Sequence, residues 1–272
     1  MTGGWKVTET MIAIILGIVE GMTEFLPVSS TGHMILVGNM LHFEGEFASV
    51  FEVFIQLGAI LSILFLYRDK FMRMIKPGRL NIHRSGLTLS HVAAGIVPVM
   101  IIGYLLHKPI KEYLFSPATV IIGLIAGSVL MLVAEKVAKR PVARSVENIT
   151  VRQAFWVGLF QVLALWPGFS RSGSTLSGGL FFGLSRTAAA DFSFIIAVPL
   201  MMVACFYDLL KVISHLSVDN LHMLAIGFVI SFVVAYGSVV WFLKFLNKST
   251  LASFAYYRLV LAAVSYYYFF MN

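Results

Sequence analysis

Long apolar segments recur along this chain, and they constrain its fold more than any other feature of the sequence. Three of them, Ser49–Tyr67, Leu87–Leu106 and Pro117–Ala134, approach the length of roughly 20 residues that a helix needs to cross a bilayer. Hydrophobic residues make up 59% of the 272 positions and charged residues only 12%, with a mean hydropathy of +0.88. A soluble domain is roughly 45–50% apolar, so the sequence predicts an all-α polytopic membrane protein.

The net charge of +7 raises the question of a nucleic-acid partner. No basic face interleaved with aromatic residues is present, which argues for no nucleic acid and for contact with the lipid bilayer. The basic residues gather instead in two loops beside apolar runs, as is typical of cytoplasmic loops. These loops contain Arg68, Lys70, Arg73, Lys76, Arg79 and Arg84, and then Lys136, Lys139, Arg140, Arg144 and Arg152.

A polar stretch, VEGMTEFLPVSSTGH, interrupts the apolar pattern between Val19 and His33. A helical pattern before it ends near Pro27, and a second short apolar segment, Met34–Phe43, follows it. Each half is too short to span a bilayer, so we predict a re-entrant helix-loop-helix. Non-helical backbone at this depth is tolerated only when it is buried in protein or lines a polar cavity.

The second half of the chain repeats this pattern. The segment GLFQVLALWPGFSRSGSTLSGG from Gly158 aligns with GIVEGMTEFLPVSSTGHMILVG from Gly17, with one residue deleted before the proline and one inserted after it. Further on, FSFIIAVP at Phe192 matches FEVFIQLG at Phe51 at a similar distance from the loop. Two matches in the same order indicate an internal duplication.

The duplication predicts a single membrane domain, residues 1–272, made of two repeats, about 1–140 and 150–272. Each repeat holds one re-entrant hairpin and three transmembrane helices, and an odd number of spans makes the second repeat inverted in the membrane. With both termini outside, only Lys6, Lys108, Lys111 and Lys211 among the loop cations face outward, in agreement with the positive-inside rule.

The two hairpin loops are predicted to meet near the middle of the membrane, as broken helices do in inverted repeats. Each loop begins a helix and is rich in hydroxyl groups, so backbone N–H groups and hydroxyls create a site for an anion. Arg171 adds a planar fork suited to phosphate oxygens and is the one cation expected at mid-membrane. The alternative is that these small residues only let helices pack closely.

Three further ionisable residues lie near the first loop. Glu20 and Glu24 are four positions apart and share a helix face, so their repulsion calls for a divalent cation, a shared proton or Arg171. Mg²⁺ held by carboxylates and substrate phosphates is one solution. His33 lies just beyond the loop, where a general acid, base or nucleophile is placed for phosphoryl chemistry. We expect Glu52 and Asp191, near span ends, to be solvated or helix-capping.

The two strings VEGMTEFLPVSSTGH and PGFSRSGSTLSGG together resemble the undecaprenyl-diphosphate phosphatase family of the bacitracin-resistance type, over nearly the whole chain. The resemblance implies removal of the terminal phosphate from a C55 polyprenyl diphosphate, which recycles the lipid carrier of cell-wall synthesis. It also implies a divalent cation (Mg²⁺ or Ca²⁺), a bacterial inner-membrane location and a site that faces outward. Association into a homodimer is compatible with it.

Carried over position by position, the resemblance assigns catalytic roles to Glu20, Glu24, Ser30, His33 and Arg171, with Glu20 and Glu24 also as metal ligands. The positions expected to bind the diphosphate are Ser29, Thr31, Gly32, Ser170, Ser172, Gly173, Ser174 and Thr175. Neither the residues nor the resemblance chooses among Ser30, His33 and a water molecule as the nucleophile. The rival function is a polyprenyl-phosphate flippase, because inverted repeats with broken helices also serve alternating access.

Overall fold

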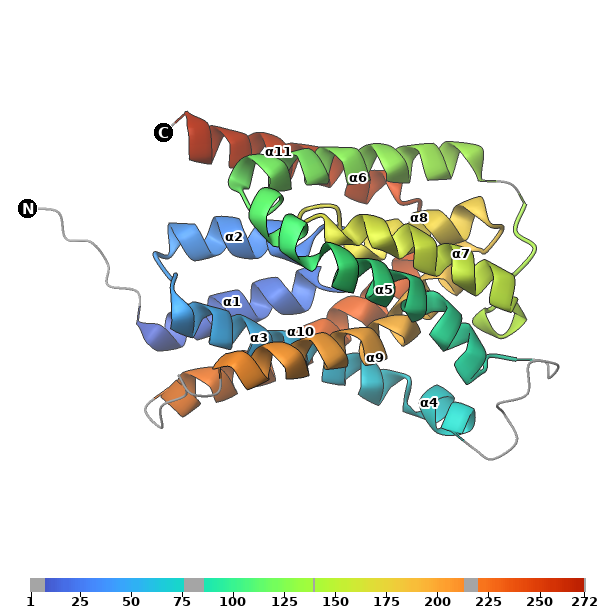
Figure 1. Cartoon of the computed structure of the whole chain (residues 1–272), viewed down its shortest axis with the longest axis horizontal. Coiled ribbons are helices and arrows are strands. Elements are labelled where there is room, and N and C mark those ends of the chain that lie inside the picture. Colours follow the sequence, from blue (N-terminus) through green and yellow to red (C-terminus); the bar gives the residue numbers. More distant parts are fainter. Residues whose placement is uncertain (1–7, 76–85, 139, 213–219, 272) are drawn as a thin grey trace, which may run out of the picture.

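The computed structural model describes residues 8–75, 86–138, 140–212 and 220–271, and within them the chain is helical (Figure 1). It forms eleven α-helices and two short 3-10 helices over these residues. The elements are α1 (Glu9–Thr23), α2 (Ser30–Met40), α3 (Glu46–Leu66), α4 (Arg68–Ile75), α5 (Leu89–Tyr113), α6 (Pro117–Val137), η1 (Val146–Asn148), α7 (Val151–Gln161), η2 (Val162–Leu165), α8 (Arg171–Phe181), α9 (Arg186–Val212), α10 (Leu221–Leu246) and α11 (Ala252–Phe270).

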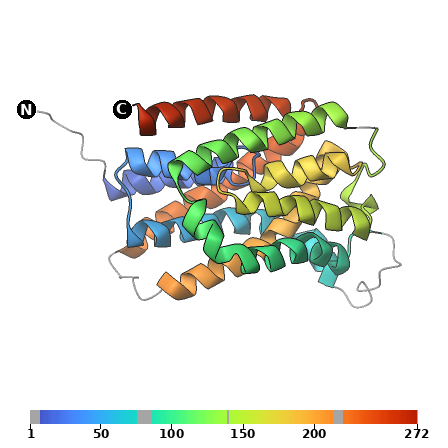
Figure 2. The same cartoon turned by 45° about the horizontal axis from the view of Figure 1, so that its top comes forward.

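The two predicted hairpins are present as helix-turn-helix pairs. Helices α1 and α2 form the first hairpin, and α7 with η2 and α8 forms the second. The hairpins extend inward from opposite ends of the molecule, and their turns lie side by side in its middle (Figures 1 and 2). A hydrogen bond of 2.7 Å from Ser172 Oγ to the carbonyl oxygen of Leu26 joins the two turns.

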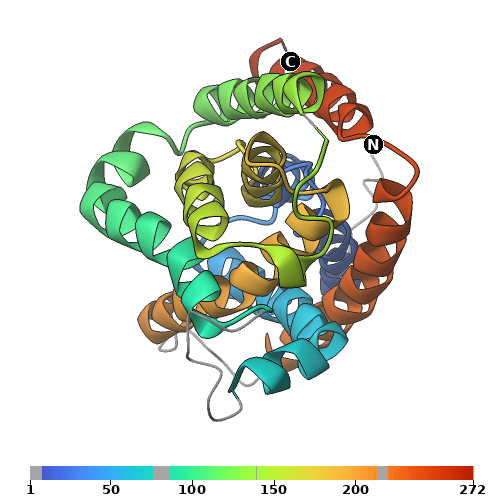
Figure 3. The ribbon, with the colours of Figure 1, turned by 90° about the vertical axis from the view of Figure 1, so that its right-hand side faces the viewer.

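Five of the described helices are long and apolar enough to cross a membrane, namely α3, α5, α6, α9 and α10. They include all three spans predicted in the first half of the chain. The sixth predicted span corresponds to α11, which has 19 residues but contains Arg258 and many tyrosines and so is less apolar. Seen along the long axis, α5, α6, α10 and α11 lie around the outside of the hairpins (Figure 3).

Glycines permit close approach between each hairpin and the span beside it. A Cβ atom at Gly17 would lie 2.9 Å from the Gly227 carbonyl oxygen of α10, and one at Gly21 would lie 2.7 Å from that of Ser231. Small residues four positions apart are typical of helices that pack closely in membranes. In the second hairpin Gly158 abuts the backbone of Gly95 in α5 in the same way.

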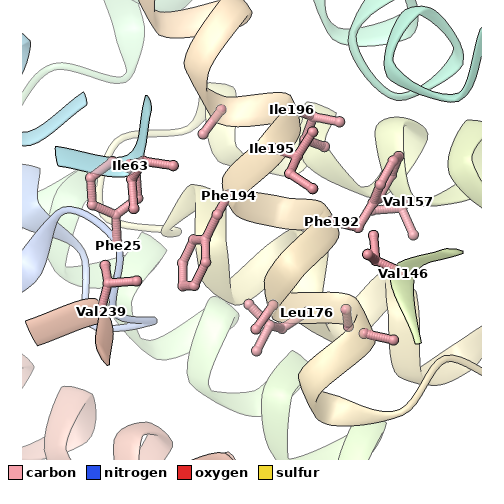
Figure 4. Close-up of a cluster of buried hydrophobic side chains, with 14 of the residues drawn as sticks. Phe25, Ile63, Val146, Val157, Leu176, Phe192, Phe194, Ile195, Ile196 and Val239 are labelled. Atoms are coloured by element: carbon pink, nitrogen blue, oxygen red, sulfur yellow. The ribbon is translucent and has the colours of Figure 1, made fainter. Parts of the chain in front are cut away.

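The hydrophobic core lies beside the hairpin turns and holds them in place. Phe25, in the first turn, makes an edge-to-face contact with Phe194 of α9, with ring centroids 5.7 Å apart (Figure 4). Phe194 also contacts Phe242 of α10, and all three rings are fully buried. Aromatic pairs of this kind fix the turn against two spans.

Asp191, predicted to be solvated or helix-capping, is partly exposed and also has protein partners. Its carboxylate accepts hydrogen bonds from Tyr67 Oη at 2.5 Å and from Lys70 Nζ at 3.3 Å, because the ends of α3 and α9 come together there. The predictions for Lys6, Lys76, Arg79, Arg84 and Lys139 concern residues outside the described ranges.

Candidate functional site

The helices that begin at the two loops start with the same unusual backbone geometry. Ser29 and Ser170, the N-cap residues of α2 and α8, have φ values of 71° and 75°, which non-glycine residues adopt at a cost in energy. Each hydroxyl accepts a hydrogen bond from the backbone N–H three residues later, at Gly32 (3.3 Å) and Gly173 (3.2 Å). The capped helix starts therefore present matching polar ends to the middle of the molecule.

A hollow of about 180 Å³ lies between these helix starts. Both loops line it, with Glu24, Ser30 and Thr31 on one side and Ser170 and Arg171 on the other. A second hollow, of about 120 Å³, is lined by Glu20, Ser30, Thr31, Glu52 and Gln56. Because Ser30, Thr31 and Gln56 line both, the two hollows adjoin at the start of α2.

The side chains best suited to chemistry contact one another across the two hairpins. Ser30 Oγ donates to Glu24 Oε2 at 2.5 Å, and Arg171 Nη2 lies 3.4 Å from Glu24 Oε1. Arg171 Nη1 donates to the Ser193 carbonyl oxygen at 3.3 Å, whereas its buried Nε has no hydrogen-bond partner among the described residues. A hydroxyl on a carboxylate, next to an arginine with a spare donor, is an arrangement that suits nucleophilic attack on a phosphate.

Comparison with known proteins agrees with the phosphate chemistry that this geometry suits. Residues 13–264 match the family described as bacitracin resistance protein BacA. The chain belongs to the BacA family. It is 51% identical over 255 residues to undecaprenyl-diphosphatase 1 of Bacillus thuringiensis (strain Al Hakam) and to that of a Bacillus cereus strain, and 50% identical to that of Bacillus anthracis. Each alignment covers 94% of this chain and 96% of the relative.

The carboxylates of this BacA-family chain provide hard oxygen donors but do not form a complete metal site. Among the described residues no group of three or more His, Cys, Asp or Glu is close enough to hold an ion. Glu20 is buried and lines the smaller hollow together with Glu52, which is exposed, and the Gln56 side chain. This donor set fits an ion that keeps waters and takes further ligands from a phosphate, as Mg²⁺ does.

The structure places His33 differently from a residue that contacts a phosphate. Its Nδ1 lies 2.8 Å from the Ser29 carbonyl oxygen and its Nε2 lies 2.7 Å from Tyr257 Oη. Both ring nitrogens therefore have protein partners, and the imidazole lines neither hollow. Its assignment as a catalytic residue stays a prediction.

The hydroxyl-rich positions of α8 are fully or almost fully buried, and most of them bond within the protein. Ser174 Oγ donates to the Ser170 carbonyl oxygen at 2.8 Å, and Thr175 Oγ1 lies 2.6 Å from Ser193 Oγ. Ser172 Oγ makes the bond between the two turns, and Gly173 packs beside Arg258. Among the positions of the second loop predicted to bind the diphosphate, only Ser170 lines the hollow, together with Arg171, while Ser29 and Thr31 do so from the first.

Arg171 is not the only enclosed cation among the described residues, while its position at mid-membrane stays a prediction. Arg258 of α11 is also enclosed, with none of its surface exposed. Sequence reasoning gave no role to Arg258 or to its neighbour Tyr257, because both lie in a tyrosine-rich segment, FAYYRLV, that is typical of a membrane interface. A cation in the middle of an apolar segment was the available signal.

Proposed function

We propose that this chain hydrolyses undecaprenyl diphosphate to undecaprenyl phosphate and inorganic phosphate, and so returns the lipid carrier to cell-wall synthesis. Its BacA relatives are named for this activity. The single observation that carries the proposal is the Ser30–Glu24 hydrogen bond next to Arg171, at the point where the two hairpins meet. An anion-binding protein without chemistry has no need of a serine held on a carboxylate.

In the proposed reaction Ser30 Oγ attacks the terminal phosphorus while Glu24 accepts the hydroxyl proton. The bond between this phosphorus and the bridging oxygen breaks, so that polyprenyl phosphate leaves and the phosphoryl group remains on Ser30. Water then attacks the phosphoserine and the bond from phosphorus to Ser30 Oγ breaks. The Ser30 oxygen takes back the proton held by Glu24, and the two protons of the water leave with the released inorganic phosphate. The geometry favours Ser30 over His33 as the nucleophile because both His33 nitrogens are engaged elsewhere.

The second hairpin supplies the charge that this reaction needs. A phosphoryl group in transfer carries negative charge on its equatorial oxygens, and stabilising that charge is the main task of the protein. Arg171 lines the hollow and can turn its Nη donors from Glu24 toward phosphate oxygens. The starts of α2 and α8 add backbone N–H groups, which favour anions.

A divalent cation, Mg²⁺ or Ca²⁺, forms part of the proposal. Glu20 and Glu24 would hold it, and the phosphate oxygens would complete its coordination. Such an ion neutralises charge on the diphosphate. Glu24 has both oxygens engaged, by Ser30 and by Arg171, so Glu20 has the carboxylate more open to an ion.

We further propose that the chain is one domain of two inverted repeats. The matched caps at Ser29 and Ser170 support this, as do the equivalent glycine contacts of Gly17 and Gly158 with α10 and α5. In this arrangement α1 to α6 correspond to α7 to α11, without α4. Both termini and the active site then face the outer side of the inner membrane. Homodimer formation remains a prediction.

Phosphate release from detergent-purified protein tests the function directly. With undecaprenyl diphosphate and Mg²⁺, and with no sealed membrane, the protein should release one inorganic phosphate per lipid, and a chelator should lower the rate. A flippase would release none under these conditions, because it needs two compartments. Ser30→Ala, purified in parallel, controls for contaminating phosphatases.

The orientation has its own test. A cysteine at Arg73 or Arg144, in a Cys205→Ala background, should resist an impermeant thiol reagent in intact cells and react after lysis. A cysteine at Lys108 should react from outside. The reverse pattern would contradict the proposed topology.

A further inference from the structure

The buried guanidinium of Arg258 is the starting point, because it makes no ion pair with any described residue. Its Nη2 donates to three carbonyl oxygens, those of Gly123 (3.2 Å), Leu124 (3.1 Å) and Gly168 (2.9 Å). Its Nη1 contacts Met131 Sδ at 3.5 Å. A buried charge without a counter-ion is costly, so its retention calls for a function.

The surroundings of Arg258 are shaped to receive it. A Cβ atom at Gly173 of α8 would lie 3.0 Å from Nη1, and one at Gly127 of α6 would overlap Nη2. Both helices therefore carry glycine where the guanidinium passes between them. The close fit holds the group against the second loop.

The bond to Gly168 connects Arg258 to the proposed anion site. Gly168 has a φ of 88° and lines the same hollow as Arg171, and Ser170, two residues later, has a φ of 75°. The positive φ of Ser170 is costly for a residue other than glycine, so the loop needs outside contacts to keep its shape. Arg258 provides one of them, and its positive charge lies behind the loop that lines the proposed anion site.

The neighbouring residue, Tyr257, makes the corresponding contact with the first loop. Because a carbonyl oxygen only accepts, His33 Nδ1 must donate to the Ser29 oxygen, and in the neutral ring Nε2 then accepts from Tyr257 Oη. The two rings are nearly parallel, at 7°, with centroids 5.6 Å apart. The relay from Tyr257 through His33 ends at Ser29, whose φ of 71° needs support in the same way.

We propose that α11 positions both loops of the site, with Tyr257 holding the first through His33 and Arg258 holding the second through Gly168. Two adjacent residues of one helix thus set the distance between the nucleophile side and the anion-binding side. Tyr257 and Arg258 are positioning residues, and His33 joins them in that role. This inference rests on the proposed function for its kinetic consequences but not for its structural ones.

A loop-specific probe tests the Arg258 contact without reference to activity. Trp166 begins the second loop and donates through Nε1 to the Thr119 carbonyl oxygen at 2.9 Å. With Trp5, Trp156 and Trp241 replaced by Phe, its fluorescence reports on this loop alone. Arg258→Gln should red-shift and broaden the emission, while Tyr257→Phe should leave it unchanged.

The Tyr257 contact has a matching probe. In protein labelled with ¹⁵N-histidine, Tyr257→Phe should alter the His33 ring nitrogen shifts, because Nε2 loses its donor, and Arg258→Gln should alter them less. Tyr256→Phe is the control, since Tyr256 is the preceding residue of α11 and is 61% exposed. It should change neither probe.

Kinetics complete the test. Loss of one positioning hydrogen bond should lower kcat/KM about tenfold for Tyr257→Phe. Arg258→Gln should raise KM by more than about tenfold. Arg258→Lys, which keeps the charge, should reverse part of that rise in KM. Unchanged probes and parental kinetics in both folded variants would overturn the proposal. If the parent releases no phosphate, the proposed function fails, while the two probes still decide the role of α11.

Discussion

The two hairpins have the same backbone frame but differ in burial and charge. Both turn at a proline, cap the following helix with a serine of positive φ, and continue into a helix of 11 residues. Nine residues of α8 are buried, against five of α2. The first hairpin carries Glu20 and Glu24, whereas the second has Gln161 at the position that aligns with Glu20, and has Arg171.

From this difference we propose a division of labour. The more open α2 would present the reacting Ser30 hydroxyl to the hollow, while the buried α8 would hold Arg171 and its loop to bind the anion. On this proposal the two similar hairpins bring two helix starts together, and their different charges separate attack from binding. Four substitutions test this division, from the largest expected effect to the smallest.

Removal of the Ser30 hydroxyl should cause the largest loss. Ser30→Ala should lower kcat by at least about a thousandfold, as loss of a nucleophile does in other hydrolases. The control in the second hairpin is Ser177→Ala, since its buried hydroxyl donates to the Gly173 carbonyl oxygen within α8 and lines neither hollow. Phosphate release from both purified variants decides the point, and comparable losses would end the proposed division.

Glu24→Gln should follow closely. It keeps the shape of the side chain but removes the proton acceptor for Ser30 and the charge opposite Arg171, and general base catalysis contributes typically about 10²–10⁴-fold. The dependence of the rate on Mg²⁺ concentration should also shift. If Gln at both Glu20 and Glu24 leaves the rate and the metal response unchanged, these carboxylates are structural.

Arg171→Lys should reduce kcat/KM by about a hundredfold, because the charge remains but the planar fork is lost. Arg171→Ala should be worse. Thermal unfolding on the same preparations separates catalysis from folding. If Arg171 only balances Glu24, both variants should unfold early and a double change with Glu24→Gln should restore stability.

Ser172→Ala should have the smallest effect on activity and a visible effect on stability. It removes the hydrogen bond between the two turns, at a cost of about 0.5–1.5 kcal/mol, while the Leu26 carbonyl still accepts from the Val28 N–H at 2.8 Å. Thr31→Ala, at the aligned position of the first hairpin, should leave the melting temperature unchanged because Thr31 is exposed. Equal shifts in both would show that the hairpins are tied symmetrically.

Much of this arrangement follows from the sequence alone. The polar loops within apolar segments predicted both hairpins, the three first spans appear where expected, and the loops were expected to meet. These features depend on the local alternation of apolar and polar segments, and a polar segment inside an apolar run can be recognised from the sequence itself.

The rest depends on where each side chain points and which helices pack together in the folded protein, and the spacing of residues along the chain does not give either. The hydroxyls of Ser174 and Thr175 are adjacent to the site in sequence, yet they bond within the protein because α8 turns them away from the hollow. Arg258 reaches the second loop only because α11 packs along α6 (Figure 1). The pairing of Asp191 with Tyr67 and Lys70 similarly needs α3 and α9 to be side by side.

Identifying the residue that takes up the phosphoryl group is the most direct test of the division between the hairpins. Purified protein is mixed with undecaprenyl diphosphate labelled at the terminal phosphate and quenched with denaturant at neutral pH within one turnover, so that both phosphoserine and acid-labile phosphohistidine survive. It is then digested and sequenced by mass spectrometry. The account predicts label on Ser30, in a peptide of the first hairpin, with slower labelling in Arg171→Lys. Label on His33 or on a serine of the second hairpin, or full turnover by Ser30→Ala, would contradict it.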